Sequence, residues 1–427
     1  MHTLERLEAG DLAGATRLDL GAGLTHFPQA AYGLADTLEV LNLTGNALHE
    51  LPHDLPRFKR LKVVFCSNNA FTYLPEVLGD CAGLEMVGFK ANRIHHVPSS
   101  ALPATLRWLI LTDNQVAELP PALGERPALQ KLMLAGNRLT ALPGALAQCE
   151  HLELLRIAGN RLASLPSWLT TLPALAWLAY AGNPLPPALC RPSGLAAHTA
   201  IDWPRLGLGQ RLGEGASGEI LQATLDGQQA VAVKLYKGDI TSDGSPLDEM
   251  AACLAAGTHP ALIPLRGQLR GHPEGRQGLV MDLIDPAFAN LGDPPSLASC
   301  SRDVYAPGLV LGPDEVEHMA HQVASLGEHL HARGIMHGDL YAHNLLWRAG
   351  GDCLLGDFGA ASFHPGDGSA QALALERLEV RAFGILLGEL LALSGATAGP
   401  LHTLQEACVG APAQRPLFRE VRGSLGN

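Results

Sequence analysis

Three side chains in the last third of the chain have types and spacings suited to metal-assisted phosphoryl transfer. Asp339 is followed after five residues by Asn344 and after eighteen residues by Asp357, which opens an Asp-Phe-Gly triplet. One carboxylate can accept the proton of an attacking hydroxyl group, while an amide oxygen and a second carboxylate can hold Mg²⁺. We therefore predict that Asp339 is a catalytic base and that Asn344 and Asp357 are metal ligands.

A glycine-rich segment upstream is a candidate phosphate site, because closely spaced glycines let backbone amides approach phosphate oxygens. Gly213, Gly215 and Gly218 form a Gly-x-Gly-x-x-Gly pattern between two segments with strand character, 206–212 and 220–224. A dinucleotide fingerprint has the same letters but needs a helix after the glycines. The strand that follows here favours a glycine hairpin over the phosphates of a nucleotide.

A lysine in the following strand is positioned to bind the same phosphates. The pattern Val-Ala-Val-Lys ends at Lys234, sixteen residues after Gly218. A lysine on such a strand can reach the α- and β-phosphates of ATP, provided that a carboxylate orients it. The amphipathic segment that starts at residue 248 offers Glu249 as that carboxylate, with Asp248 as the competing candidate.

Three segments between this lysine and the candidate catalytic residues have distinct patterns. Residues 278–284 are typical of a strand and hinge behind an adenine pocket, and Met281 would be its gatekeeper. Residues 285–313 are rich in Pro, Gly and Ser, so they predict either a solvated insertion or part of a substrate surface. Residues 315–333 have the apolar period of a long helix that would lead into the catalytic loop.

Taken in order, these motifs over residues 205–425 resemble the eukaryotic-like protein kinase superfamily. The resemblance implies an α+β bilobal fold, ATP as phosphate donor with Mg²⁺, and Ser/Thr-type protein phosphorylation. It also implies that Asp339, Lys234 and Glu249 are catalytic. The residues that it implies for nucleotide binding are Gly213, Gly215, Gly218, Ile220, Ala232, Lys234 and Met281.

The chain departs from the protein kinase pattern at several positions. Gly338 stands where an Arg usually precedes the catalytic Asp, and that Arg normally pairs with a phosphorylated activation segment. Tyr341 replaces the Lys that usually assists transfer. Glu379 stands where the large helix of the C-terminal lobe usually carries Asp. Because few residues separate Asp357 from Glu379, the activation segment between them is short. Two alternatives therefore stay open, an ATP-binding pseudokinase scaffold and a small-molecule kinase.

The first part of the chain is a repeat array. Asparagines recur every 22 or 23 residues, each in the same frame, and the clearest copy is the Leu-x-x-Leu-x-Leu-x-x-Asn that ends at Asn137. They are Asn46, Asn69, Asn92, Asn114, Asn137, Asn160 and Asn183. This pattern resembles leucine-rich repeats, which implies an α/β solenoid with a curved parallel sheet. We predict a repeat domain over residues 1–190, a linker over 191–204 and a kinase domain over 205–427.

The strand positions beside the core leucines indicate where a partner would bind. Six of the seven residues before the first strand leucine are apolar, which is unusual for a strip that faces solvent. The position is often apolar in such repeats, which is the simpler explanation. The alternative is a hydrophobic groove on the concave face, around Trp108 and Trp177, that binds a protein partner or substrate.

Composition and charge limit the remaining function classes. The 30 basic and 42 acidic residues give a net charge of −12, which does not favour binding to nucleic acid or to an anionic membrane. The eight cysteines are scattered without metal-ligand spacing, as expected for reduced thiols. We expect neither a secretory signal nor a membrane span and predict a cytoplasmic protein, with export by a signal-independent route left open.

Overall fold

The computed structural model describes residues 2–190, 199–215, 217–238, 240–241 and 243–426. The chain forms two compact units, Met1–Ala174 and Leu175–Asn427. The first unit thus ends before the last predicted repeat, whose strand groups with the second unit. Of the predicted linker, residues 191–198 lie outside the described residues.

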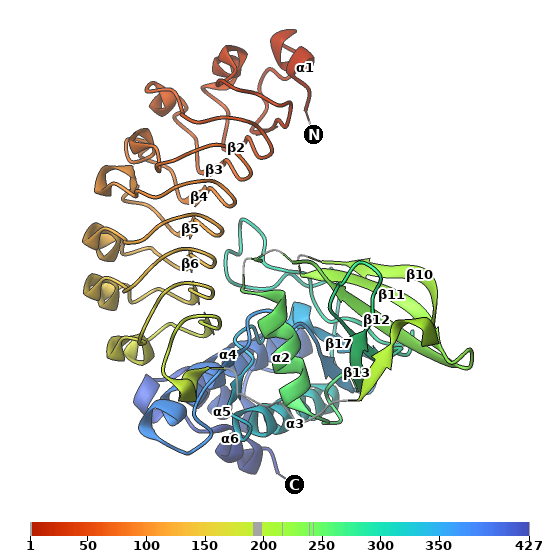
Figure 1. Cartoon of the computed structure of the whole chain (residues 1–427). Coiled ribbons are helices and arrows are strands. Elements are labelled where there is room, and N and C mark those ends of the chain that lie inside the picture. The colour runs from red at the N-terminus through yellow and green to blue at the C-terminus, as the bar shows by residue number, and fades with distance from the viewer. Residues whose placement is uncertain (1, 191–198, 216, 239, 242, 427) are drawn as a thin grey trace. The chain divides into compact units, whose positions relative to one another are not determined.

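The first unit is a stack of short parallel strands, seen in red to yellow in Figure 1. It starts with helix α1 (Leu4–Glu8) and continues with three-residue strands that pair in parallel, each with the next. These strands are β1 (Arg17–Asp19), β2 (Val40–Asn42), β3 (Val63–Phe65), β4 (Met86–Gly88), β5 (Trp108–Ile110), β6 (Lys131–Met133) and β7 (Leu154–Arg156). The chain therefore has the leucine-rich-repeat solenoid that the asparagine spacing predicted.

Short 3₁₀ helices return the chain from each strand to the next. They are η1 (Gln29–Leu34), η2 (Leu55–Arg57), η3 (Glu76–Leu78), η4 (Ser99–Ala101), η5 (Pro121–Glu125), η6 (Gly144–Gln148) and η7 (Ser167–Thr171). Most of them follow a proline, which presets the backbone φ and cannot donate a hydrogen bond.

The repeated asparagines join neighbouring repeats. Asn137 Oδ1 accepts a hydrogen bond from the Val116 amide at 2.9 Å, and its Nδ2 donates to Leu111 O at 2.8 Å and Leu134 O at 2.9 Å. The Val116 amide would otherwise be buried at a desolvation cost, and the two carbonyls also accept hydrogen bonds from Asn114 and Asn160. The strand leucines Leu132 and Leu134 are fully buried beside them, so the core is shared along the stack.

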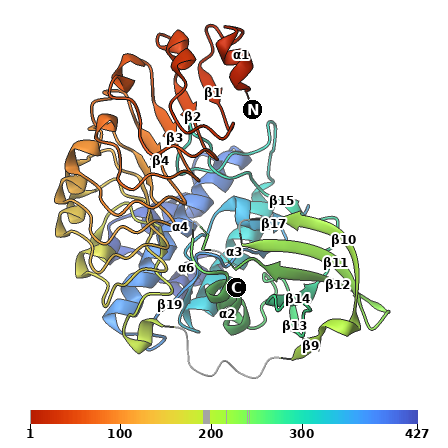
Figure 2. The same ribbon diagram turned by 45° about the horizontal axis from the view of Figure 1, so that its top comes forward.

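The large sheet of the second unit contains a strand that sequence patterns did not predict. Strand β9 (Ala200–Asp202), inside the range predicted to be a linker, pairs in parallel with β13 (Leu265–Arg270). It is the edge of a six-stranded sheet with the order β10-β11-β12-β14-β13-β9, visible in Figure 2. The other strands are β10 (Leu206–Glu214), β11 (Gly218–Leu225), β12 (Gln229–Tyr236) and β14 (Gly278–Asp282). Helix α2 (Pro246–Ala256) follows β12 in the chain.

The rest of the second unit is mainly helical and carries two small sheets. Its helices are α3 (Pro313–His331), α4 (Ala370–Ser394), α5 (Pro400–Val409) and α6 (Phe418–Ser424). One small sheet contains β15 (Ala289–Asn290), β17 (Leu345–Trp347) and β18 (Cys353–Leu355), and the other contains β16 (Ile335–Met336) and β19 (Ser362–Phe363). The described residues of this unit also form the 3₁₀ turns η8 (Pro187–Leu189), η9 (Trp203–Arg205), η10 (Ala342–Asn344) and η11 (Pro412–Gln414).

A six-stranded sheet with one helix, followed by a helical part, matches the predicted bilobal α+β architecture. Helix α4 begins at Ala370, because Ser369 caps its first turn by accepting a hydrogen bond from the Ala372 amide. Within the described residues, none of the helices has the length and apolarity needed to cross a membrane.

Candidate active site

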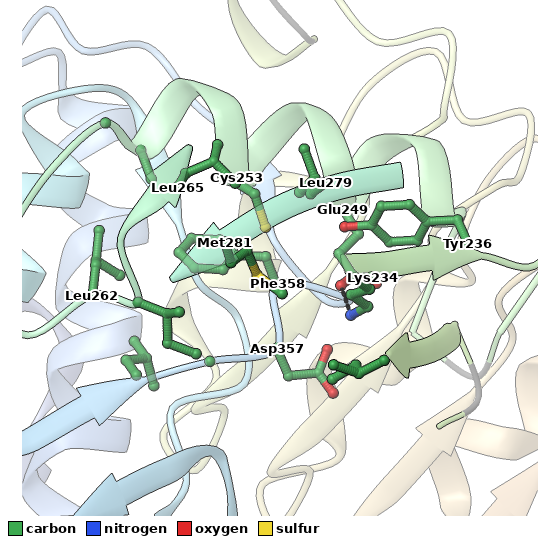
Figure 3. Close-up of a pocket in the computed structure, with 16 residues that line it drawn as sticks. Lys234, Tyr236, Glu249, Cys253, Leu262, Leu265, Leu279, Met281, Asp357 and Phe358 are labelled. Carbon is green, nitrogen blue, oxygen red and sulfur yellow. Dashed lines mark hydrogen bonds and ion pairs between the residues drawn. The ribbon is translucent and has the colours of Figure 1, made fainter. Parts of the chain in front are cut away.

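Three adjoining cavities in the second unit share lining residues and form one cleft. The innermost is lined by Lys234, Glu249, Met281 and Asp357, among others, and is shown in Figure 3. A second, mostly apolar cavity continues from Met281 past Ala232 to the hinge. The third holds the polar groups that the sequence singled out, Gly213, Gly215, Gly218, Lys234, Asn344 and Asp357. The predicted nucleotide-binding residues therefore gather in one place.

Strand pairing explains how the apolar part of the cleft is built. Ile220 on β11 lies opposite Lys234 on β12, and Ala232 lies opposite Met281 on β14. Residues two apart on a strand point to the same face of the sheet. Ala232 and Lys234 therefore face the cleft together, with Ile220 and Met281 on the neighbouring strands.

Lys234 forms an ion pair with Glu249, which lies in the first turn of α2. The Lys234 side chain is 15% exposed and that of Glu249 only 2%. Burial alone would lower the pKa of Lys234, but the carboxylates of Glu249 and Asp357 outweigh it and raise the pKa above the ordinary value. Lys234 is therefore a fixed cation inside the cleft.

The competing carboxylate, Asp248, is not the partner of this lysine. Ser245 caps α2 by accepting a hydrogen bond from the Leu247 amide at 3.2 Å, which sets where the first turn begins. From that start, Glu249 is buried and reaches Lys234, whereas Asp248 is partly exposed. The second Glu249 oxygen, Oε2, is buried without a hydrogen-bond partner among the described groups.

Asp339 and Asn344 are joined by hydrogen bonds within the catalytic loop, residues 337–344. Asn344 Nδ2 donates to Asp339 O and to Asp339 Oδ2, both at 2.8 Å. The amide nitrogen is thereby used, so the Asn344 Oδ1 atom is the one left to bind a cation. The 3₁₀ turn η10 ends at Asn344 and brings it back beside Asp339.

His337 holds the start of this loop in place. Its Nε2 donates to Gly356 O at 2.9 Å, so its Nδ1 is the acceptor that takes a hydrogen bond from the Asp339 amide at 3.3 Å. The first of these bonds links the loop to the residue before Asp357. His337 therefore sets the separation of the candidate base and the candidate metal ligand.

Glu379 on α4 holds the backbone of the catalytic loop through hydrogen bonds. Its carboxylate accepts hydrogen bonds from the Gly338 amide at 2.6 Å, from the His337 amide at 3.1 Å and from His331 Nε2 at 2.7 Å. Burial would raise the pKa of Glu379, but the hydrogen bond from His331 and the nearby His337 lower it below the ordinary value. A buried carboxylate thus fixes the backbone on which Asp339 sits.

Asp357 has an unusual backbone conformation. Its φ is +46°, in a region of backbone conformation that residues other than glycine seldom adopt. One of its oxygens, Oδ1, accepts a hydrogen bond from the Gly359 amide at 3.0 Å. Figure 3 shows the Asp357 carboxylate beside Lys234, where both face the cleft.

A buried Asp–His pair beside the candidate base was not found from the sequence. Asp303, from the segment 285–313, accepts hydrogen bonds from the His343 amide at 2.9 Å and from His343 Nδ1 at 2.7 Å. The side chain of Asp303 is fully buried, and His343 Nε2 lies 3.9 Å from Asp339 Oδ2. Of the two interpretations of the segment 285–313, the solvated insertion is therefore wrong for Asp303. Asp303 and His343 are forty residues apart in the sequence, so no motif spacing could have linked them.

The two tryptophans predicted for a concave binding face have different surroundings. Trp108 is partly buried; its ring lies 6.4 Å from that of Phe65, and Lys131 Nζ is 4.8 Å from the ring centre. Trp177 is fully buried and donates a hydrogen bond from Nε1 to Leu340 O. The prediction that Trp177 offers a free surface is therefore wrong, because this ring packs inside the second unit.

Comparisons with known families agree with the two parts of the chain. Residues 207–377 match the protein kinase domain, and residues 104–162 and 127–185 match the leucine rich repeat. The chain therefore contains a protein kinase domain and leucine-rich repeats.

Several curated proteins share one part or the other. A probable serine/threonine-protein kinase of Arabidopsis thaliana is 25% identical over 37% of this chain and 21% of its own length. Cyclin-dependent kinase 11B of Rattus norvegicus is 29% identical over 42% of this chain and 39% of its own length. The transforming growth factor beta activator LRRC32 of Mus musculus is 36% identical over 24% of this chain and 16% of its own length. The chain thus spans well under half the length of each of these relatives.

Proposed function

Starting from a chain that joins leucine-rich repeats to a protein kinase domain, we propose that it is an ATP-dependent phosphotransferase, most simply a Ser/Thr-type protein kinase. The observation that carries this proposal is the set of polar groups around one cleft. A buried Lys234–Glu249 pair faces Asp357, and Asn344 is hydrogen-bonded to Asp339 beside them. These are the groups that phosphoryl transfer requires.

The residues of the cleft fit a nucleotide with a bound magnesium ion. Ile220, Ala232 and Met281 line an apolar cavity suited to an adenine ring, and the glycines lie at the polar end beside Lys234. Asn344 Oδ1 and the Asp357 carboxylate are hard oxygen donors of the kind that Mg²⁺ prefers. The described residues hold no cluster of three or more His, Cys, Asp or Glu side chains that could bind a metal alone. Phosphate and water oxygens would therefore complete the shell.

In this proposal each protein group has a defined task. Lys234, kept charged by Glu249, binds the phosphates of the nucleotide, and the glycine hairpin covers them. Asp339 orients the hydroxyl group of the acceptor and takes its proton, while Asn344 holds the Asp339 carboxylate by a hydrogen bond. Mg²⁺, when bound at Asn344 and Asp357, neutralises phosphate charge. His337 and Glu379 keep these groups at fixed separations.

The test compares the wild-type chain with Asp339→Asn, using labelled ATP and both the chain itself and a cell lysate as acceptors. We expect transfer by the wild type and a loss of at least about 100-fold in the variant, because the proton acceptor is removed. Asp314→Asn, on an exposed residue at the start of α3, is the matched control and should transfer normally. Equal labelling by wild type and Asp339→Asn would leave only the scaffold alternative.

The acceptor is the less constrained half of the proposal. The short activation segment between Asp357 and α4 leaves little chain for a peptide platform, which favours the second candidate, a small-molecule kinase. Label recovered in small metabolites and absent from proteins would support that candidate. Label on Ser or Thr of proteins would support the protein kinase.

The repeat array is proposed to bind a protein partner or substrate through its strand face around Trp108. Ile110 on the same strand, Met133 on β6 and Phe65 on β3 are partly buried and offer apolar surface beside this ring. Such an aromatic anchor suits protein binding, and capture on the array would raise the concentration of a substrate near the cleft. Trp108→Ala should lose partners that Trp168→Ala retains in a pull-down; retention of all partners by both would end this idea.

A reducing compartment such as the cytoplasm is proposed as the site of action. None of the eight cysteines, all of them among the described residues, is in a disulfide, and most are buried thiols; burial raises the pKa of Cys149, for example, to about 11. Labelling of thiols in lysed cells under alkylating conditions tests this directly, since oxidised cysteines would escape the reagent.

A further inference from the structure

One strand with the sequence of a leucine-rich repeat lies inside the second unit. Strand β8 (Trp177–Ala179) and the following Tyr180 belong to the second compact unit, and each of their side chains is fully buried. The strand occupies the position of a seventh asparagine repeat, with Asn183 after it. Its contacts within the second unit are unlike those of an ordinary capping strand.

The first contact is with the catalytic loop. The ring of Trp177 stacks on that of Tyr341, with ring centres 4.1 Å apart and planes within 8° of parallel. Trp177 Nε1 donates a hydrogen bond to Leu340 O at 3.1 Å. These two partners are the residues directly after Asp339, so Trp177 holds the backbone that carries the candidate base.

The second contact is with the activation segment. The Tyr180 amide donates to Ser362 Oγ at 3.0 Å, and the Tyr180 hydroxyl donates to Phe363 O at 2.8 Å. Both partners lie in β19, which pairs with β16 just before the catalytic loop. Tyr180 therefore holds the segment that follows Asp357.

The third contact explains the glycine that replaces the usual Arg. Gly338 has φ +74°, and a Cβ atom added there would lie 2.5 Å from Leu178 O and 2.7 Å from Ala360 O. The carbonyl of β8 fills the space that a side chain at position 338 would need. Gly338 and Tyr341, the two departures of the loop from the kinase pattern, thus both touch β8.

We infer that β8 and Tyr180 form a clamp that positions the catalytic loop and the activation segment, in the place that an Arg–phosphate contact takes in kinases activated by phosphorylation. The clamp consists of a ring stack and neutral hydrogen bonds, so it needs no phosphate to form. Trp177 and Tyr180 are positioning residues in this view, because they act on Asp339 and Asp357 through Leu340 and Phe363. The catalytic consequence rests on the proposed function; the structural consequence does not.

The test uses two mild variants of the full chain, since a buried Trp177→Ala protein could fail to fold. Tyr180→Phe removes only the hydroxyl that bonds Phe363 O, and Trp177→Phe removes only the indole donor and part of the stack. Tyr32→Phe and Trp168→Phe are the matched controls, because they make the same changes in the first unit. Hydrogen exchange is measured on peptides covering 337–345 and 358–364, and transfer of label from ATP is measured in parallel.

We expect exchange in these two segments to rise about tenfold in both clamp variants and to stay unchanged in both controls, as for the loss of one buried hydrogen bond. The turnover rate should fall with little change in the KM for ATP, because the nucleotide groups of the sheet are untouched. Ser362→Ala, which removes the Oγ acceptor of the Tyr180 amide, should give the same pattern.

Unchanged exchange in all three clamp variants would overturn the inference, whatever the activity. Exchange that rises equally throughout the second unit would overturn it as well, because the contacts would then support the whole unit and not these two segments. Faster turnover in a clamp variant would also contradict it, since the strand would then be an inhibitor. A wild-type chain that transfers no more label than Asp339→Asn would refute the proposed function alone, because the exchange measurement still reports on the clamp.

Discussion

Alanine at position 338 should lower the stability of the second unit in two ways, through the contacts of its Cβ atom with Leu178 O and Ala360 O and through backbone strain. Alanine at φ +74° carries about 1 kcal/mol of conformational strain. Its Cβ would also meet Leu178 O at 2.5 Å and Ala360 O at 2.7 Å, both of them backbone atoms that cannot rotate away. Overpacking of this kind costs about 1–3 kcal/mol. The sum is a loss of about 3 kcal/mol of stability from the second unit.

The assay is thermal unfolding followed by circular dichroism at the helical band, because the long helices α3 and α4 lie in the second unit. For a unit of this size, about 3 kcal/mol corresponds to a fall in Tm of roughly 6–12 °C. Gly227→Ala is the matched control, since Gly227 has φ +69° and an added Cβ there would have no other atom within 4 Å. It should lose only the conformational part, about 1 kcal/mol.

The difference between the two variants measures the contact with Leu178 and Ala360. If Gly338→Ala is no less stable than Gly227→Ala, the carbonyls do not enclose position 338 and the account of the missing Arg is wrong. If Gly338→Ala is less stable by the expected margin, its hydrogen exchange should also rise over residues 358–364.

Three further outcomes can be checked on the same protein. Lys234→Met should abolish detectable label transfer and weaken ATP binding by at least about 100-fold in calorimetry, because the fixed cation of the cleft is lost; binding at wild-type strength would contradict the role of Lys234. Burial raises the pKa of Glu389 to about 7, so the folded protein binds a proton at this carboxyl more tightly than the unfolded chain does. The contribution of Glu389 to the free energy of unfolding is therefore fully present below pH 4.5 and is lost as the pH rises through 7. Glu389→Gln should therefore match the wild type near pH 5 and exceed it by up to about 3 kcal/mol at pH 8.5 in urea unfolding, and a difference that does not change with pH would refute this. Asn137→Ala leaves the buried Val116 amide without its acceptor, while Leu111 O and Leu134 O keep hydrogen bonds from Asn114 and Asn160, and it should cost about 1–3 kcal/mol in unfolding of the array, against a negligible cost for the exposed Gln148→Ala.

Much of this structure could be predicted because it repeats or follows an ordered set of motifs. The position before each strand leucine marks the first residue of strands β2 to β8, as at Val40 and Trp177, since every repeat buries the same face. The choice of Glu249 over Asp248 was also available, because a helix start and one buried face select one of two adjacent carboxylates. Periodicity and local spacing carry this information.

The features that were missed all depend on contacts between distant segments. Strand β9 is three residues long and lies in a segment without alternating pattern, so only its pairing with β13 makes it a strand. Asp303 gave no signal in a loop rich in serine and proline. Trp177 had the sequence of an ordinary repeat residue, and nothing local distinguishes a ring that binds a partner from one that packs against Tyr341.

The clamp also constrains how the chain can fold. Trp177 is 163 residues from Leu340, and Tyr180 is 182 and 183 residues from its two partners. During synthesis these side chains leave the ribosome long before the segments that bury them, and contacts this far apart in sequence form late and slowly. The apolar side chains of β8 and Tyr180 therefore lack these partners until the last third of the chain is synthesised. We expect chaperones to bind at this strand, and we expect misfolding to start there when synthesis stops early.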